Sequence, residues 1–356
     1  MRIGILTFPN SPSFGAALQM CALYRALENL GIEVEIINYR NKYMSQKKHI
    51  KKHSQNVFKR GIISLLDIPG KMKFKDFEKK LTFYPNYILS DYDNLDIISK
   101  RYDYLICGSD QVWNPHITGE DLNYFFHFCN DDSKKISYAA SFGVNVLNAT
   151  YSKKISTEIE KFKCISVREE QGKKILSNLT SKKCSIVLDP SMLLSAHEWR
   201  SYEKKYSKLP KEYIARFIFN YDKNVEDQIA KFSQQKKLPI VTIGGTLFSK
   251  IKNKYHTGPI GPNEWLYILD NAKYVVTDSF HGAAFSIIFH KNLFVSMAST
   301  TNSRLYTLLN TFGLLDRVID RSLLDYEINY EQVQKVMDDH KGESLEFLKK
   351  AIEIGV

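Results

Sequence analysis

Short apolar runs that alternate with helical patterns constrain the fold of this chain more than any other feature. Residues 2–8 form a compact apolar run, and residues 15–31 place apolar side chains at helical spacing up to Gly31. Residues 32–39 then alternate as a strand does. A strand, a helix and a second strand in this order predict a parallel sheet covered by helices.

The pattern continues along the first half of the chain and starts again after Asp189 and Pro190. In the first half, we expect further strands at residues 104–107, 136–140, 164–167 and 186–188. In the second half, strands are expected at 213–221, 239–245, 273–279 and 293–297, with helices at 225–235, 263–272, 280–289 and 302–314. A chain of 356 residues exceeds the usual size of one hydrophobic core.

These observations predict an α/β protein with two Rossmann-like domains that face each other across a cleft. We place the domains at residues 1–200 and 201–356, and we expect the terminal helix, at about 331–354, to pack back on the N-terminal domain. Ligands in such sheets bind beyond the carboxyl ends of the strands, so the residues that follow each strand are the candidates for a site.

The net charge of +11 is concentrated in one segment. Residues 40–80 hold thirteen Lys and Arg against three acidic residues, a net charge of +10. Because the rest of the chain is nearly neutral, we expect no nucleic-acid partner. Apolar residues interleave with the basic ones, so this basic insertion is interpreted as a docking segment for an anionic membrane surface. The alternatives are a solvated loop and, for residues 62–68, a part of the hydrophobic core.

The sequence also indicates a location and the absence of a bound metal. No apolar run is long enough to cross a bilayer, and the N-terminus lacks a signal-peptide pattern, so we expect a cytoplasmic protein that can attach to the inner face of the membrane. The five cysteines are scattered and never form CxxC, and Walker A, HExxH and GxSxG sequences are absent. We therefore expect no metal and no cofactor.

In the first half, polar residues follow several predicted strands. Asp110 and Gln111 follow residues 104–107, with Trp113 behind them, and a carboxylate, an amide and an aromatic face suit a sugar ring. The same residues also make ordinary turns. Arg168 can form paired hydrogen bonds to a phosphate or carboxylate, or a surface ion pair with its acidic neighbours. Ser141 follows another strand, and Gly15 could bring the backbone close to an anion, although its loop lacks GxGxxG.

In the second half, the segment VVTDSFHGAAFSIIF, residues 275–289, carries the strongest signal. A helix is expected to begin near Ser279, and the N-terminus of a helix binds anions through its free N–H groups and its dipole. His281 could add a hydrogen bond or a proton at that point. The alternative is that Asp278 or Ser279 caps the helix and His281 packs structurally.

Together, these segments resemble the polysaccharide pyruvyl transferase family. The matching stretches appear in the family's order and cover about residues 1–320: SFGAALQMCAL (13–23), YLICGSDQVWNP (104–115), ISYAASFG (136–143), ISVREEQG (165–172), VLDPSMLL (187–194) and VVTDSFHGAAFSIIF (275–289). The resemblance implies a GT-B-like architecture and transfer of pyruvate from phosphoenolpyruvate to a hydroxyl pair of a hexose, in a sugar or lipid-linked glycan acceptor. The products are a pyruvate ketal and phosphate.

The resemblance further implies that Arg168 and His281 hold the donor, with Ser279 and Gly282 in the same motif. Some members carry a basic residue directly before the histidine, where this chain has Phe280. Lys291 and Arg304 are the candidates to replace it, and Arg304 is the better one because it opens a helix after the following strand. His281 remains either a proton donor or a phosphate ligand. A GT-B nucleotide-sugar glycosyltransferase and an inactive sugar- or membrane-binding homologue are the competing interpretations.

Overall fold

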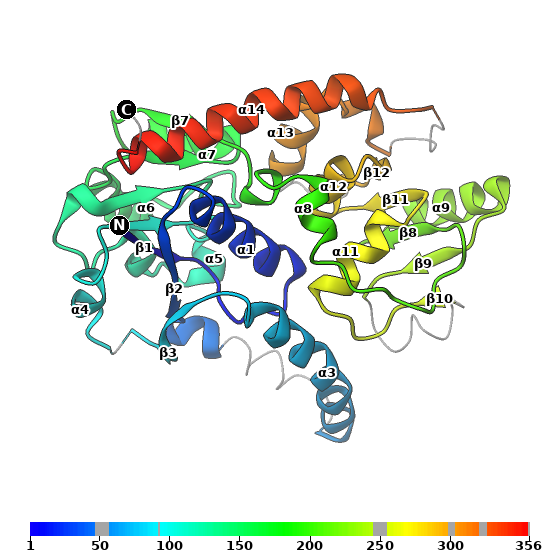
Figure 1. Cartoon of the computed structure of the whole chain (residues 1–356), viewed down its shortest axis with the longest axis horizontal. Helices are drawn as coiled ribbons and strands as arrows, with labels where there is room; N and C mark the ends of the chain where they lie inside the picture. The colour runs from blue at the N-terminus through cyan, green and yellow to red at the C-terminus, as the bar shows by residue number, and fades with distance from the viewer. Residues whose placement is uncertain (47–56, 92, 245–254, 298–302, 320–325, 355–356) are drawn as a thin grey trace. The chain divides into compact units, whose positions relative to one another are not determined.

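A computed structural model describes residues 1–46, 57–91, 93–244, 255–297, 303–319 and 326–354 of the chain (Figure 1). The chain forms two compact units. The first unit consists of Met1–Leu66, Glu78–Leu193 and His340–Val356, and the second consists of Asp67–Phe77 and Leu194–Asp339. The division lies near residue 193, and the segment 67–77 of the basic insertion belongs to the second unit. The segment 47–56 of that insertion lies outside the described residues.

The first unit contains a five-stranded parallel sheet in the order β3-β2-β1-β4-β5 and a smaller parallel pair, β6-β7. The strands are β1 (Arg2–Leu6), β2 (Glu33–Tyr39), β3 (Phe83–Leu89), β4 (Tyr104–Cys107), β5 (Lys135–Ser137), β6 (Ile165–Val167) and β7 (Cys184–Ile186). The helices are α1 (Phe14–Glu28), α4 (Leu95–Ser99), α5 (Pro115–Thr118), α6 (Ala149–Ile159) and α7 (Glu170–Ser177), with short 3₁₀ helices η1 (Leu122–Phe125), η2 (Asp132–Lys134) and η3 (Pro190–Met192).

The second unit contains a five-stranded parallel sheet in the order β10-β9-β8-β11-β12. Its strands are β8 (Ile214–Phe217), β9 (Ile240–Thr242), β10 (Tyr255–His256), β11 (Tyr274–Thr277) and β12 (Asn292–Val295). Its helices are α8 (Ala196–Arg200), α9 (Lys223–Lys236), α11 (Pro262–Asp270), α12 (Phe280–Ile288) and α13 (Ser303–Thr311), with η4 (Leu315–Arg317). Helix α3 (Val57–Glu78) and helix α14 (Tyr330–Ala351) each contribute residues to both units.

Aromatic packing fills the core of the first unit. Trp113 is completely buried and stacks on Phe125, with ring centroids 5.1 Å apart, and Phe142 and Phe162 complete the cluster. The side chain expected to offer an aromatic face to a sugar is therefore a core residue. That part of the Trp113 interpretation was wrong, because three aromatic rings pack around this side chain and leave none of it exposed.

The terminal helix α14 packs on the first unit through its C-terminal half. The Ser344 hydroxyl accepts a hydrogen bond from the backbone N–H of Leu188 at 2.9 Å, and Phe347 contacts the buried Tyr138 ring. Beyond the helix, Glu353 forms an ion pair with Lys163 at 2.6 Å. In the described part of the chain, no helix is long and apolar enough to cross a membrane.

Candidate functional site at the carboxyl edge of each sheet

The segment that carried the strongest sequence signal forms the β11–α12 junction of the second unit. Ser279 is the N-cap of α12, and its hydroxyl accepts a hydrogen bond from the backbone N–H of Gly282 at 3.4 Å. The Thr277 hydroxyl donates to the backbone carbonyl of Phe217 at 2.7 Å and accepts from the backbone N–H of Ser279 at 3.0 Å. The first turn of α12 is thus fixed against the ends of β8 and β11.

Gly282 allows this close approach. A Cβ atom at position 282 would lie 2.4 Å from the Thr277 hydroxyl and 3.1 Å from the Phe217 ring. A side chain there would push the helix away from the strands. The glycine of the motif therefore positions the N-terminus of α12, where N–H groups and the helix dipole favour an anion.

His281 lies in the first turn of α12 and is 9% exposed. Its ring contacts Phe280 edge-on, with centroids 5.2 Å apart. Phe280 itself is buried, so the position that is basic in some family members holds a packing residue here. Arg304 is the second residue of α13, which follows β12, so it belongs to the same edge of the sheet as Ser279 and His281.

Lys291 lies at the opposite edge. It directly precedes β12, and its ammonium group lies 3.6 Å from the Asp270 carboxylate and also bonds to the Asp270 carbonyl. Burial lowers the pKa of Lys291, and Asp270 opposes this shift. The strands are parallel, so Lys291 before β12 and the residues after β11 are at opposite edges of the sheet. This placement does not favour Lys291 as a substrate ligand beside His281, and that role stays a prediction.

In the first unit, Arg168 follows β6 and its side chain is completely buried among three carboxylates. Its guanidinium contacts Asp189 at 2.7 Å, Asp110 at 3.2 Å and Glu169 at 3.7 Å. Burial alone would lower the pKa of Arg168, but these carboxylates, Asp189 first, hold it above its ordinary value. Arg168 is thus not a surface ion pair, and its contacts favour a role in positioning the carboxylates. Its role as a ligand of the donor stays a prediction.

Asp110 is the carboxylate of this cluster that reaches the surface, with a side chain 15% exposed. It follows β4 at a φ of 77°, a left-handed conformation that Asp tolerates better than most residues. Its Oδ1 atom accepts from Arg168 and from the backbone N–H of Gln111 at 2.8 Å. The Gln111 side chain in turn accepts a hydrogen bond from the Asn114 amide at 2.7 Å.

Ser141 and Gly15 are buried in the same unit. The Ser141 hydroxyl donates to the Glu169 carboxylate at 2.7 Å, which makes Ser141 a connector within the cluster. Gly15 lies in the first turn of α1, after the cap residue Ser13. The residues brought together at this edge are therefore Asp110, Gln111, Ser141 and Arg168. Asp189 and Glu169, which were not chosen as site residues, complete the cluster; Asp189 was recognisable because it follows a predicted strand.

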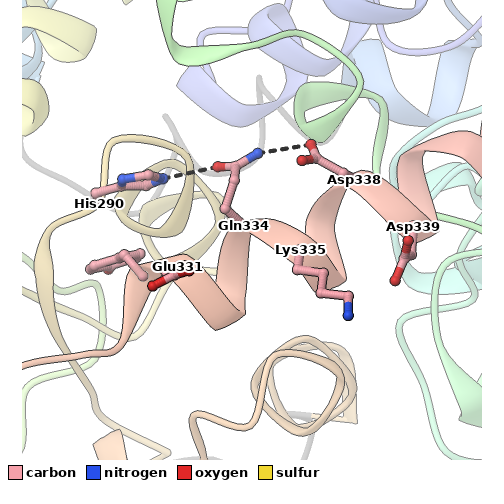
Figure 2. A pocket seen from close by; sticks show the side chains of 7 residues that line it. His290, Glu331, Gln334, Lys335, Asp338 and Asp339 are labelled. Atoms are coloured by element: carbon pink, nitrogen blue, oxygen red, sulfur yellow. Dashed lines mark hydrogen bonds between the residues drawn. The ribbon is translucent and has the colours of Figure 1, made fainter.

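A hollow of about 490 Å³ lies along α14. Figure 2 shows the side chains that line it. His290 stacks on Tyr330 there and shares a hydrogen bond of 3.0 Å with Gln334, which donates to Asp338 at 2.9 Å. His290 precedes β12, so this hollow lies at the amino edge of the second sheet and away from the β11–α12 junction. Among the described residues, no three His, Cys, Asp or Glu are grouped to hold a metal ion.

Comparison with solved structures identifies the class of fold. The chain resembles UDP-GlcNAc 2-epimerase from Methanocaldococcus jannaschii in complex with UDP-GlcNAc and UDP, with a TM-score of 0.54 and 14% identity over 98% of this chain and 99% of that chain. It also resembles a putative UDP-N-acetylglucosamine 2-epimerase from Listeria monocytogenes (TM-score 0.54, 10% identity, 98% and 91% covered) and UDP-GlcNAc 2-epimerase from Neisseria meningitidis bound to UDP-GlcNAc (0.51, 12%, 99% and 94%).

These likenesses define a GT-B-like α/β fold built from two Rossmann-like units, as predicted. At such low identity they describe the fold alone. The family is given by the sequence: the model of the polysaccharide pyruvyl transferase family matches residues 14–296, so the chain belongs to that family. No curated protein matches it.

Proposed function

We propose that this chain transfers pyruvate from phosphoenolpyruvate to a pair of hydroxyls on a hexose of a cell-surface or exported polysaccharide. The observation that carries the proposal is the family match over residues 14–296, which includes both the Asp110 and the His281 segments. Family membership supports a transferase of polysaccharide biosynthesis, and the donor and the ketal product are the finer part of the proposal.

The donor phosphate is proposed to bind at the N-terminus of α12. Phosphoenolpyruvate is a compact anion, and helix N–H groups, Ser279, His281 and the cationic Arg304 all belong to the carboxyl edge of the second sheet. Gly282 keeps this helix end close to the strands. These groups can neutralise a leaving phosphate without a metal.

The reaction is proposed to begin with protonation of the donor's methylene carbon, with His281 as the candidate acid. The C2 carbon then gains oxocarbenium character, and a sugar hydroxyl forms a C–O bond to it. Phosphate leaves with the C2–O bond electrons, and the neighbouring hydroxyl closes the ketal ring. The acceptor gains the mass of one pyruvate less one water. Of the two protons that the hydroxyls lose, one returns to His281 and the other goes to the released phosphate.

In the first unit, Asp110 and Gln111 are proposed to hydrogen-bond acceptor hydroxyls, because Asp110 is the carboxylate of the cluster that reaches the surface. Arg168 is a positioning residue for Asp110 through the contact at 3.2 Å. A lipid-linked acceptor would also give a use to the net charge of +10 in residues 40–80, so we include cytoplasmic attachment to an anionic membrane in the proposal.

The test is phosphate release from phosphoenolpyruvate in the presence and absence of glycans. The proposal expects release that depends on a hexose-containing glycan. If UDP-sugars are consumed instead, with no release from phosphoenolpyruvate, the nucleotide-sugar glycosyltransferase interpretation replaces it.

A further inference from the structure

Two large aromatic side chains stand exposed on the loop between β8 and α9 of the second unit. Phe219 is 71% exposed and Tyr221 is 78% exposed. The sequence predicted a strand through residues 213–221, which would have paired and covered these residues. The strand ends at Phe217 instead, so the apolar pattern continues on a surface loop.

Hydrogen bonds fix this loop to the β11–α12 junction. Asp278, which precedes the cap residue Ser279, accepts from the backbone N–H groups of Phe219 and Asn220 at 2.9 and 2.8 Å. It also accepts from the Asn220 side chain at 3.0 Å. The same short segment of chain thus carries the proposed donor-binding helix end and holds the exposed aromatic loop beside it.

The loop that carries the two aromatic side chains is anchored at both ends. The Phe219 ring contacts the buried Phe217 ring edge-on at 4.9 Å, and Phe217 packs on the core residue Trp265 at 5.5 Å. At the other end, Asp222 caps α9 by accepting from the backbone N–H of Asn224 at 2.8 Å. A loop held in this way loses little conformational entropy when a ligand binds to it.

We propose that Phe219 and Tyr221 form an aromatic platform that holds a sugar ring of the glycan acceptor by stacking; this rests on the proposed function. One face of a hexose ring presents C–H groups of positive polarity, and the face of an aromatic ring is negative. Asn220 and Asp278 beside the rings supply polar groups for the hydroxyls at the edge of the sugar. Because Trp113 is buried, this platform takes the role that the sequence had suggested for Trp113.

The surroundings favour a sugar over a protein partner. The loop offers two exposed rings, and its polar neighbours are Asn220 and Asp222 in the chain and Asp278 through hydrogen bonds to the loop. A stable protein interface needs a far larger area. A single ring-shaped ligand with a polar circumference matches the size and the polarity of this surface.

The test measures binding and transfer separately. Cellobiose, galactobiose, mannobiose and N-acetylmannosamine are titrated against the full chain by NMR saturation transfer, without donor, and uridine is included as a nucleoside probe. We expect at least one of these sugars to bind, and Phe219→Ala and Tyr221→Ala each to weaken that binding by roughly 5- to 10-fold. Phe219→Trp, which keeps an aromatic ring at this position, should bind the sugar as the wild type does. Tyr87→Ala, which removes a ring 59% exposed on β3, is the matched control and should change nothing.

In transfer assays, the same alanine variants should raise the KM for the acceptor and leave the KM for phosphoenolpyruvate unchanged. Sugar binding that is absent in the wild type, or unchanged in both alanine variants, overturns the platform, as does preferential binding of uridine to these rings. Failure of the proposed function has a different signature, because the wild type then releases no phosphate from phosphoenolpyruvate whatever the platform binds.

Discussion

At the scale of single residues, Arg168 combines complete burial with three acidic neighbours. Removing one member of a buried ion pair typically costs about 3–5 kcal/mol, because the remaining charges lose their partner. From the sequence alone, Arg168→Ala is expected to abolish donor binding with the fold intact. The burial of Arg168 changes that expectation to a large loss of stability.

We therefore predict that Arg168→Ala lowers the free energy of unfolding by about 3–5 kcal/mol, measured by urea denaturation followed by circular dichroism. Arg168→Lys keeps the charge but loses the planar guanidinium, so the stability of this variant should lie between those of the wild type and Arg168→Ala. A variant with wild-type stability that no longer binds phosphoenolpyruvate would contradict the positioning role and return Arg168 to the donor site.

Kinetic measurements can distinguish a catalytic or phosphate-binding role of His281 from a structural role. If it donates the proton to the donor, His281→Gln should lower kcat by at least ~100-fold with a smaller change in KM. If it binds phosphate, the KM for phosphoenolpyruvate should change more than kcat. Values of both constants near those of the wild type would show that His281 only packs at the helix end.

At the scale of elements, a pH-dependent contact joins α8, α11 and the start of β12. Glu203 follows α8, and burial together with the neighbouring Asp270 raises its pKa to about 7. Arg200 lies 2.8 Å from Asp270 and Lys291 lies 3.6 Å away, so the pKa of Asp270 is lowered despite its burial. Below about pH 7, the Glu203–Asp270 pair therefore keeps a proton, mainly on Glu203.

Because folding raises the pKa of Glu203, the folded protein keeps a proton that the unfolded chain has already lost between about pH 4.5 and 7. Stability should therefore fall as pH rises through this window. We predict that Glu203→Gln removes this dependence and stabilises the protein by about 1 kcal/mol above pH 7, a value reduced for solvent screening. Thermal melts at a series of pH values test it, and a wild-type slope in the variant would contradict it.

The strands show what local patterns can predict. The β4 prediction at 104–107 was confirmed because four nonpolar or aromatic residues stand between polar turns. Strand β3 was missed because Pro85 interrupts its pattern, and an edge strand tolerates the proline. Helix α3 was missed because Pro69 and Gly70 lie within a dense run of lysines.

The site was predictable in part for a related reason. The rule on strand ends selected Asp110, Arg168 and Ser279 from the sequence alone. It could not predict that Arg168 is buried, because its closest partner, Asp189, is 21 residues away along the chain. Nor could the sequence predict that Phe219 is exposed, since an alternating apolar pattern does not show where a strand ends.

At the scale of the whole molecule, the net positive charge is unevenly distributed along the chain, and residues 40–80 carry most of it. Within the described part of α3, Phe74 and Phe77 are buried, and Lys73 pairs with Glu264 at 2.9 Å. Ile68 and Met72 are exposed one helical turn apart, at 44% and 59%. An exposed apolar pair among lysines suits the headgroup region of an anionic bilayer.

We predict salt-sensitive co-sedimentation with vesicles that contain phosphatidylglycerol and none with phosphatidylcholine alone. The double variant Ile68→Asp, Met72→Asp should lose most of this binding. Ile97→Asp, at a residue 62% exposed on α4, is the control and should bind as the wild type does. Equal binding to both vesicle types would refute membrane docking and leave the transferase proposal untouched.

The central claim, that this chain moves pyruvate from phosphoenolpyruvate onto a glycan, is tested most directly by the mass of the acceptor. The purified chain is incubated with phosphoenolpyruvate labelled with carbon-13 and a panel of short and lipid-linked hexose glycans, and the products are examined by mass spectrometry. The account predicts a labelled product heavier by one pyruvate less one water, formed in equal amount with free phosphate and lost in His281→Gln. Unmodified glycans with intact phosphoenolpyruvate across the panel, or transfer of a sugar from a nucleotide, would contradict it.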